Sequence, residues 1–256
     1  MKQYIVDAFT DKLFSGNPAA VCILEENLSD ETMLNIAREN NLSETAFIFK
    51  ENNYYNLRWF TPTSEIDFCG HATLASAYTL FNYYDIEEDE ITFMAKIGTL
   101  TVKRVSDYYE MTFPVYNYEK VDINEDMIKA FNVKPREAYL SRDLLLIYDL
   151  DDYTKIRVDY DYVEKLDATC IAISCESEEY DCISRVFAPR IGIKEDPVTG
   201  STHCLIAPYW SNKLGKNEII AFQDSERGGV LKCKIMDNMI KISGKAVIYS
   251  ISELYI

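Results

Sequence analysis

The sequence predicts a globular α+β protein made of two halves that share one plan. Three observations support this prediction: strand-like segments run through the whole chain, two helix-like segments are apolar on nearly every side, and a glycine precedes each of them. A helix without a polar face belongs in a core, so we expect one buried helix in each half. A polar stretch after residue 114 places the boundary between halves 1–115 and 116–256, with the last strand free to return to the first half.

The composition supports a folded chain and narrows the possible partners. Hydrophobic residues make up 48% and charged residues 27% of the 256 residues, which is typical of a packed protein. The formal net charge of −16 disfavours partners such as nucleic acid or an anionic membrane surface. No apolar run approaches the ~20 residues of a membrane span, and the first ten residues lack a signal-peptide pattern. We therefore expect a cytoplasmic protein.

In the first half, two helices interrupt a series of strands. Ser29 is a typical N-cap for an amphipathic helix that ends near Glu39, and the apolar run 71–84 predicts the buried helix. Alternating or continuously apolar segments bounded by turn residues predict the strands. These segments are 4–10, 19–24, 45–50, 54–60, 90–95, 99–105 and 108–114, and 65–68 is short and extended.

The second half repeats this order. Short helices are expected at 125–131 and 158–166, and the mostly apolar run 204–214 predicts the second buried helix. The expected strands are 143–148, 169–174, 182–189, 218–223, 228–236, 239–244 and 246–251.

The glycines before the two buried helices suggest a ligand site. Gly70 opens the first helix and Gly200 the second, and the scarce histidines His71 and His203 follow within three residues. Free backbone N–H groups at a helix start attract anions, so a carboxylate ligand would suit both places. Each glycine alone is more simply a tight turn, but its repetition beside a histidine favours a function. We expect His203 to have a packing or supporting role.

Three residues could form an acid–base set that needs no metal or cofactor. Glu44 ends a polar turn and faces an apolar strand, where partial desolvation would suit a general base. His71 could donate or relay a proton, and Asp196 lies just before the second helix. The competing interpretations are an ordinary surface glutamate, a capping histidine and a turn aspartate.

The cysteines point to other, weaker alternatives. There are seven, an odd number without CxxC spacing, so neither a disulfide framework nor a structural zinc knuckle is expected. The Cys69-x-His71 and His203-Cys204 spacings are poor for one zinc site, and no metal is expected. Cys69 as the nucleophile or base of a racemase is a better rival hypothesis. No nucleotide-binding fingerprint occurs in the sequence.

Several motifs resemble the phenazine-biosynthesis isomerase (PhzF-like) family. They are DAFTDKLFSGNPAAVCIL, NLSETAF, EIDFCGHATLASAY, SRVFAPRIGIKEDPVTGSTHCLIAPYW and QDSERGG, and SRDLLL fits within the less distinctive middle. The resemblance implies a diaminopimelate-epimerase-like fold, with two halves that each wrap a curved, mostly antiparallel sheet round a central helix. It further implies an active site in the cleft between the halves, a homodimer, and no metal or organic cofactor.

The resemblance also assigns roles to individual positions. Glu44 would be the proton shuttle, His71 with the Gly70 amide would orient the substrate or relay the proton, and Asp196 would complete the catalytic set. Ser43, Gly200 and Ser201 would bind the substrate, the last two holding its carboxylate. Asn17, within the first motif, is a further candidate for substrate contact. Related racemases use a cysteine at each helix start, whereas here the second start offers Thr199-Gly200-Ser201.

Together these features predict a cofactor-independent isomerase that moves a proton on a small carboxylate metabolite through Glu44. Two alternatives remain open: a non-catalytic metabolite-binding protein of the same fold, and a racemase or epimerase that works through Cys69.

Overall fold

The computed structural model describes the backbone of residues 1–256 and every side chain except that of residue 191. The chain divides into two compact units. Unit 1 comprises Met1–Thr112 and Ser243–Ile256, and unit 2 comprises Phe113–Ile242. The sequence-based division at 115/116 assigned the last strand to the second half while allowing it to return, and in the structure this strand belongs to unit 1.

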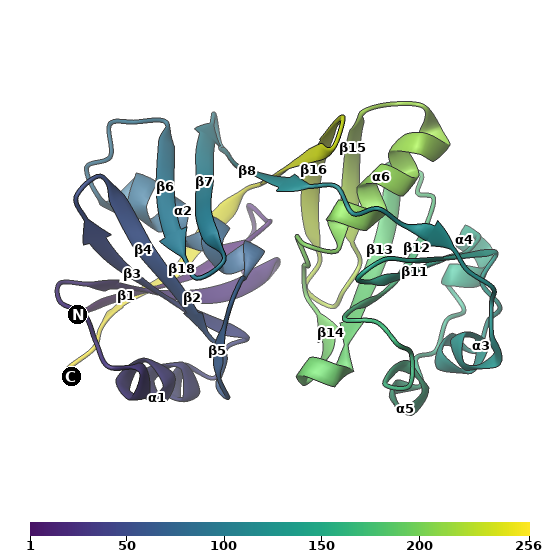
Figure 1. Cartoon of the computed structure of the whole chain (residues 1–256), viewed down its shortest axis with the longest axis horizontal. Coiled ribbons are helices and arrows are strands. Elements are labelled where there is room, and N and C mark those ends of the chain that lie inside the picture. Colours follow the sequence, from purple (N-terminus) through teal and green to yellow (C-terminus); the bar gives the residue numbers. More distant parts are fainter. The chain divides into compact units, whose positions relative to one another are not determined.

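Unit 1 is one sheet curved around the buried helix α2 (Gly70–Tyr83) (Figure 1). The helix packs against strands from distant parts of the sheet, namely β1, β2, β3, β7 and β18, so the sheet has to bend round it. In spatial order the strands are β18 (Ala246–Glu253), β1 (Lys2–Ala8), β2 (Asn17–Leu24), β3 (Glu44–Glu51), β4 (Tyr54–Phe60), β6 (Glu90–Ala95), β7 (Gly98–Val105) and β8 (Tyr108–Pro114). The pairs β2–β3 and β4–β6 are parallel and the others antiparallel, while β5 (Glu65–Ile66) pairs with the end of β4.

The polar residues of α2 are compatible with burial because they bond within the helix. The hydroxyls of Thr73, Ser76 and Thr79 donate to the carbonyls four residues earlier, at 2.6, 2.7 and 2.9 Å. Such bonds satisfy a hydroxyl where no water reaches it. The sequence 70–83 can therefore fill a core although it contains one serine and two threonines.

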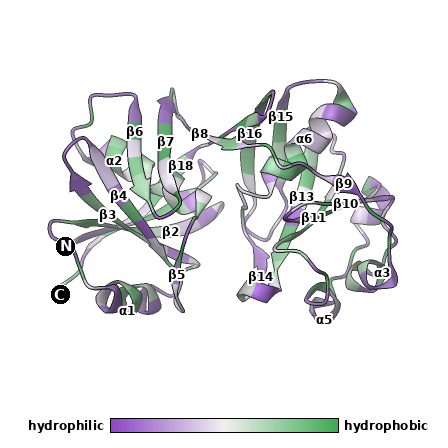
Figure 2. Cartoon of the chain, viewed as in Figure 1, coloured by the Kyte–Doolittle hydropathy of each residue, from purple (hydrophilic) through white to green (hydrophobic). Residues whose placement is uncertain are grey.

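Helix α1 (Asp30–Asn40) covers the opposite face of this sheet. The Ser29 side chain accepts from the Thr32 N–H at 3.1 Å, which confirms the expected N-cap. Apolar and polar residues alternate round the helix (Figure 2), and Met33, Ile36 and Ala37 pack against Phe47 and Phe60 of the sheet.

Unit 2 repeats the strand pairings of unit 1 around helix α6 (His203–Leu214). Its strands in spatial order are β9 (Glu119–Lys120), β10 (Glu137–Leu140), β11 (Leu144–Ile147), β12 (Ile171–Cys175), β13 (Cys182–Ala188), β15 (Glu218–Gln223) and β16 (Gly229–Met236). The pairs β11–β12 and β13–β15 are parallel, as are β2–β3 and β4–β6 in unit 1. Along the chain, α2 follows the short strand β5 and precedes β6. In the same way, α6 follows the short strand β14 (Ile193–Asp196) and precedes β15. The two halves therefore follow one plan, as the sequence predicted.

The outer face of the unit 2 sheet carries three short helices, α3 (Glu125–Phe131), α4 (Leu150–Tyr153) and α5 (Tyr160–Val163). Their buried residues Met127, Phe131, Tyr153 and Val163 join one apolar cluster with Phe187 of β13. The expected helix at 158–166 is shorter than predicted, and α4, β9, β10 and β14 were not predicted.

Helix α6 contains Pro208, which has no N–H to donate to the carbonyl of Cys204. The N–H of Tyr116 donates to this carbonyl instead, at 3.0 Å. The segment after β8 thus supplies the hydrogen bond that the proline omits. Among the described residues, no helix combines the length and the apolar character that crossing a membrane requires.

The chain returns to unit 1 through β17 (Met239–Gly244). A Cβ on Gly244 would lie 2.3 Å from Cδ1 of Phe9 and 3.1 Å from Cδ1 of Leu74. Only a residue without a side chain permits this close approach, so glycine allows β18 to close unit 1.

Candidate active site

The acid–base residues of unit 1 meet where β3 and α2 begin. Glu44 is the first residue of β3, His71 is the second residue of α2, and Cys69 is its N-cap residue. The His71 Nε2 atom lies 3.1 Å from Oε2 of Glu44, and the Cys69 Sγ atom lies 3.4 Å from Nδ1 of His71. Each of these residues is only 6–7% exposed. The structure thus brings together Glu44 and His71, which the sequence predicted, and adds Cys69 to them.

The electrostatics of this cluster favour a charged histidine beside a protonated thiol. Burial opposes the charged imidazole, but hydrogen bonding with Cys69 and the negative charge of the nearby Glu44 carboxylate raise the pKa of His71 well above 6.5. Burial, and next the Glu44 carboxylate, raise the pKa of the Cys69 thiol above 9.0. Since the thiol stays protonated near neutral pH, we attribute the charge on His71 chiefly to Glu44. The pair therefore places a carboxylate, which can accept a proton, beside an imidazolium, which can donate one.

The other predicted residues of unit 1 border this cluster. Ser43 precedes Glu44 and is half-buried, and Asn17 is the fully buried first residue of β2, the strand that pairs with β3. Gly70 opens α2, as expected, and a Cβ there would meet only Phe68, at an ordinary 3.8 Å. The surrounding protein therefore does not itself require glycine at position 70.

In unit 2, Asp196 belongs to a loop that is fixed by hydrogen bonds. The Thr199 hydroxyl donates to its carboxylate. The buried Gln223 of β15 donates to the Asp196 carbonyl at 2.7 Å and accepts from the Thr199 N–H at 2.8 Å. These bonds hold the loop before α6 in one conformation, and the catalytic role of Asp196 stays a prediction.

The second helix begins later than the sequence suggested. Gly200, Ser201 and Thr202 form a turn and α6 starts at His203, so Gly200 does not open this helix. The His203 Nδ1 atom lies 2.8 Å from the Thr199 carbonyl, and burial lowers the pKa of His203 to about 4. A neutral, fully buried imidazole is suited to packing and poorly suited to donating a proton.

An arginine that sequence reasoning missed lies at the same turn. The Arg142 guanidinium donates to Ser201 Oγ at 3.2 Å and makes two bonds, of 3.1 and 3.0 Å, to the Asp143 carboxylate. Asp143 is fully buried and also accepts from the Thr202 hydroxyl at 3.0 Å and the Cys170 N–H at 3.3 Å. The guanidinium lies 5.0 Å from the centre of the Tyr116 ring. Hydrogen bonds from three residues thus hold the Asp143 carboxylate in place. This carboxylate in turn holds the Arg142 guanidinium beside Ser201.

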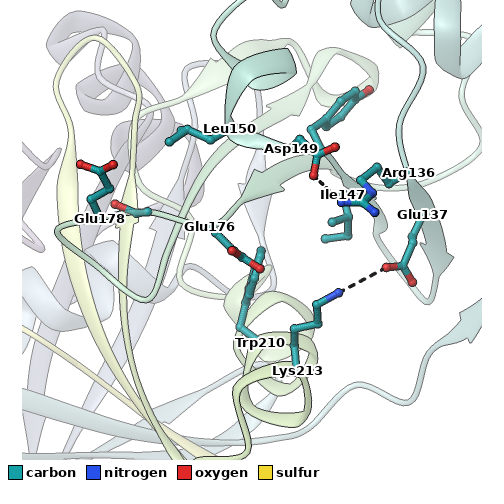
Figure 3. A pocket seen from close by; sticks show the side chains of 11 residues that line it. Arg136, Glu137, Ile147, Asp149, Leu150, Glu176, Glu178, Trp210 and Lys213 are labelled. Carbon is teal, nitrogen blue, oxygen red and sulfur yellow. Dashed lines mark hydrogen bonds and ion pairs between the residues drawn. The ribbon is translucent and has the colours of Figure 1, made fainter.

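A separate cavity of about 280 Å³ in unit 2 contains none of the predicted residues (Figure 3). Its walls carry Lys213 paired with Glu137 and Arg136 paired with Asp149, at 3.7 and 2.5 Å. Glu176 and Glu178 lie on its other side (Figure 3). This lining is mainly of exposed charges, and it offers no acid–base pair like that of Glu44 and His71.

Comparisons with known proteins place the fold. A crystal structure of a PhzF family protein from Enterococcus faecalis matches with a TM-score of 0.97 and 43% identity, covering 100% of this chain and 99% of that one. A probable proline racemase from Agrobacterium radiobacter matches with a TM-score of 0.61 at 8% identity, over 99% of this chain and 92% of that one, and shares the fold alone. The fold is thus the diaminopimelate-epimerase-like fold that the sequence predicted.

Sequence comparison identifies the family. The family model described as "Phenazine biosynthesis-like protein" matches residues 6–251. An uncharacterized isomerase from Halalkalibacterium halodurans is 42% identical over 257 residues, covering 98% of this chain and 97% of the relative. Because both matches span nearly the whole sequence, the chain belongs to the phenazine biosynthesis-like (PhzC-PhzF) family, as its motifs predicted.

Proposed function

We propose that this protein is a cofactor-independent isomerase that moves a proton on a small carboxylate-bearing metabolite. The isomerase class follows from the family, whose members include relatives named as isomerases. The proposal depends mainly on one observation, the buried contact of 3.1 Å between Glu44 and His71.

In this mechanism the Glu44 carboxylate takes a proton from a carbon that its neighbouring groups make acidic. Oε2 contacts His71, which leaves Oε1 to receive the proton. Glu44 then returns the proton at another position on the same face of the metabolite, so the net reaction is an isomerisation. The His71 imidazolium keeps the carboxylate oriented and stabilises negative charge that develops on the substrate.

A racemase mechanism through Cys69 would need a thiolate as base. Burial and the nearby carboxylate raise the pKa of this thiol, which works against that role at neutral pH. The Cys69→Ser variant separates the two mechanisms, because a serine hydroxyl cannot act as a thiolate base while the Glu44–His71 pair remains. Retained turnover supports Glu44, and a loss as large as that in Glu44→Gln supports Cys69.

We assign a carboxylate-binding role to the turn of unit 2 that contains Gly200 and Ser201. Arg142 supports this assignment, because its side chain is 42% exposed and yet fixed by the buried Asp143. A guanidinium that is oriented beforehand binds a carboxylate with a smaller loss of side-chain entropy.

Solvent deuterium exchange tests the proposed function. Small amino- and hydroxycarboxylic acids are incubated with the protein in D₂O, and mass spectrometry measures deuterium at carbon. We expect exchange with the wild type, and exchange slower by ~10²–10⁴-fold in Glu44→Gln, since a positioned general base contributes about this factor. Glu51→Gln, at the exposed far end of β3, is the matched control and should retain the wild-type rate.

Full exchange by Glu44→Gln would show that Glu44 is not the base. Binding of panel members without any exchange by the wild type would instead favour a non-catalytic metabolite-binding protein.

A further inference from the structure

We propose that Glu44, Cys69 and His71 also form a site for a divalent cation of the Zn²⁺ type, which inhibits the protein by replacing the proton of the acid–base pair. The three side chains offer one oxygen, one sulfur and one nitrogen, and these ligand atoms all lie within 4.8 Å of one another. The binding itself depends only on this geometry, whereas the inhibition also rests on the proposed function.

The separations of the three atoms suit a tetrahedral ion. His71 Nε2 lies 3.1 Å from Glu44 Oε2 and 3.9 Å from Cys69 Sγ. Zinc bonds of about 2.0 Å to nitrogen or oxygen and about 2.3 Å to sulfur place two tetrahedral ligands roughly 3.3–3.5 Å apart. The two observed separations lie on either side of this range. Because Sγ lies nearer to Nδ1, at 3.4 Å, than to Nε2, the imidazole ring has to rotate before one ion can bind all three atoms.

The types of ligand atom select the class of cation. Thiolate and imidazole favour Zn²⁺, Co²⁺ and similar borderline ions, whereas Mg²⁺ and Ca²⁺ prefer an all-oxygen site. Three protein ligands leave the fourth tetrahedral position open to water or to a metabolite's carboxylate. The ligands start from β3 and from the N-cap and first turn of α2, two regular elements that keep the three backbones in place.

The corresponding place in unit 2 does not offer such a site. His203 Nδ1 already contacts the Thr199 carbonyl, and Cys204 follows it inside the helix. Within the part of the chain whose side chains are described, Glu44, Cys69 and His71 are the one group of three such ligands that lies close enough together. The site is therefore a property of unit 1 and not of the repeated plan.

Binding of the ion replaces protons and involves no oxidation. Bonds form from the ion to Sγ, Nε2 and a carboxylate oxygen, while the thiol proton and the proton held between His71 and Glu44 pass to solvent. An ion on Oε2 withdraws negative charge from the carboxylate, so Oε1 becomes a weaker acceptor for the substrate's proton. Occupancy therefore slows proton transfer at this pair.

Cobalt is the probe that tests the site. Co²⁺ is added to the full chain under reducing conditions, and the near-ultraviolet absorption of a cobalt–thiolate bond is recorded together with the ratio of bound Co²⁺ to protein. We expect this absorption at one Co²⁺ per chain, its loss in Cys69→Ser, and its displacement by Zn²⁺. Cys22→Ser removes another fully buried thiol of unit 1 and should keep the absorption.

Absence of the absorption in the wild type, or its persistence in Cys69→Ser, would overturn the proposed site whatever the protein's activity. The deuterium exchange assay gives a separate result: it should slow with Co²⁺ occupancy and recover with a chelator. Unchanged exchange at full occupancy would overturn the inhibition, and exchange without any Co²⁺ binding would refute the site but keep the proposed function.

Discussion

The helices α2 and α6 occupy corresponding places in the two units, yet their starts carry different chemistry. At α2, the side chains of Glu44 and His71 form a buried carboxylate–imidazole contact beside a thiol. At α6, the histidine is neutral, and the charged groups are Arg142 and the carboxylate Asp143, which together fix the turn through Ser201 and Thr202. In the proposed function, the helix start of unit 1 moves a proton and that of unit 2 holds an anion. Substitutions at the two helix starts test this division.

The largest effect is expected from removing the buried carboxylate of unit 2. Asp143→Ala leaves a guanidinium, a hydroxyl and a backbone N–H without their acceptor, so the free energy of unfolding should fall by about 3 kcal/mol. This is the low end for a broken buried ion pair, because Arg142 keeps contact with water. Urea unfolding measures the effect. Asp167→Ala, which removes the exposed partner of Arg190, should cost under about 1 kcal/mol, and equal losses in the two variants would contradict the structural role of Asp143.

Arg142→Gln should weaken the binding of a carboxylate ligand while leaving the acid–base pair intact. A charge-assisted hydrogen bond contributes about 1.5–3 kcal/mol, which corresponds to roughly 10–100-fold in affinity. Calorimetry with an active metabolite, or the ratio of KM to kcat, separates binding from turnover. Arg190→Gln serves as the control, and an equal loss of affinity in both variants would assign the effect to net charge.

The His71–Glu44 pair should make stability depend on pH. Since the pKa of His71 is raised above its unfolded value of about 6.5, its contribution is fully present below pH 6.5 and is lost as pH rises through the folded pKa. A tenfold difference in proton affinity between the folded and unfolded states corresponds to about 1.4 kcal/mol. Urea unfolding between pH 5 and 9 should show this decline in the wild type, and a flatter profile in His71→Gln. Parallel profiles would mean that His71 is not charged in the folded protein.

The smallest effect is expected from restoring the missing N–H in α6. Replacing a helical proline with alanine usually stabilises a helix by about 3 kcal/mol. Here the Tyr116 N–H already satisfies the Cys204 carbonyl, so Pro208→Ala should change the free energy of unfolding by less than about 1 kcal/mol. Thermal unfolding tests this, and a gain near the usual value would show that the Tyr116 bond does not compensate for the proline.

Much of the fold could be predicted because apolar pattern and glycine position are local signals. The run 71–84 lacks a polar face, so it identified a buried helix, and the family motifs added the curved sheet round it. The start of α6 was misplaced because Gly200, Ser201 and Thr202 continue a turn whose geometry depends on Gln223 of a later strand. The short strands β9, β10 and β14 were missed because their few residues form no recognisable pattern.

The site was only partly predictable, for a similar reason. Glu44 and His71 lie beside recognisable sequence features, but Cys69 became part of the cluster only when β3 and α2 were placed together. Arg142 and Asp143 look like a polar turn before a strand, and nothing local indicates a fully buried carboxylate. Its partner Thr202 is 59 residues away in sequence, and a contact of that kind leaves no local signature.

The return of Ser243–Ile256 to unit 1 has a consequence for the order of events on the ribosome. Unit 2 is continuous in sequence, so it can fold as soon as residue 242 has emerged, whereas β1 waits for its partner β18 until synthesis is nearly complete. Until then, one edge of the unit 1 sheet presents unpaired backbone groups to neighbouring nascent chains. The later part of the polypeptide would therefore mature before the earlier part, and a stop codon before β18 would damage the unit that was translated first.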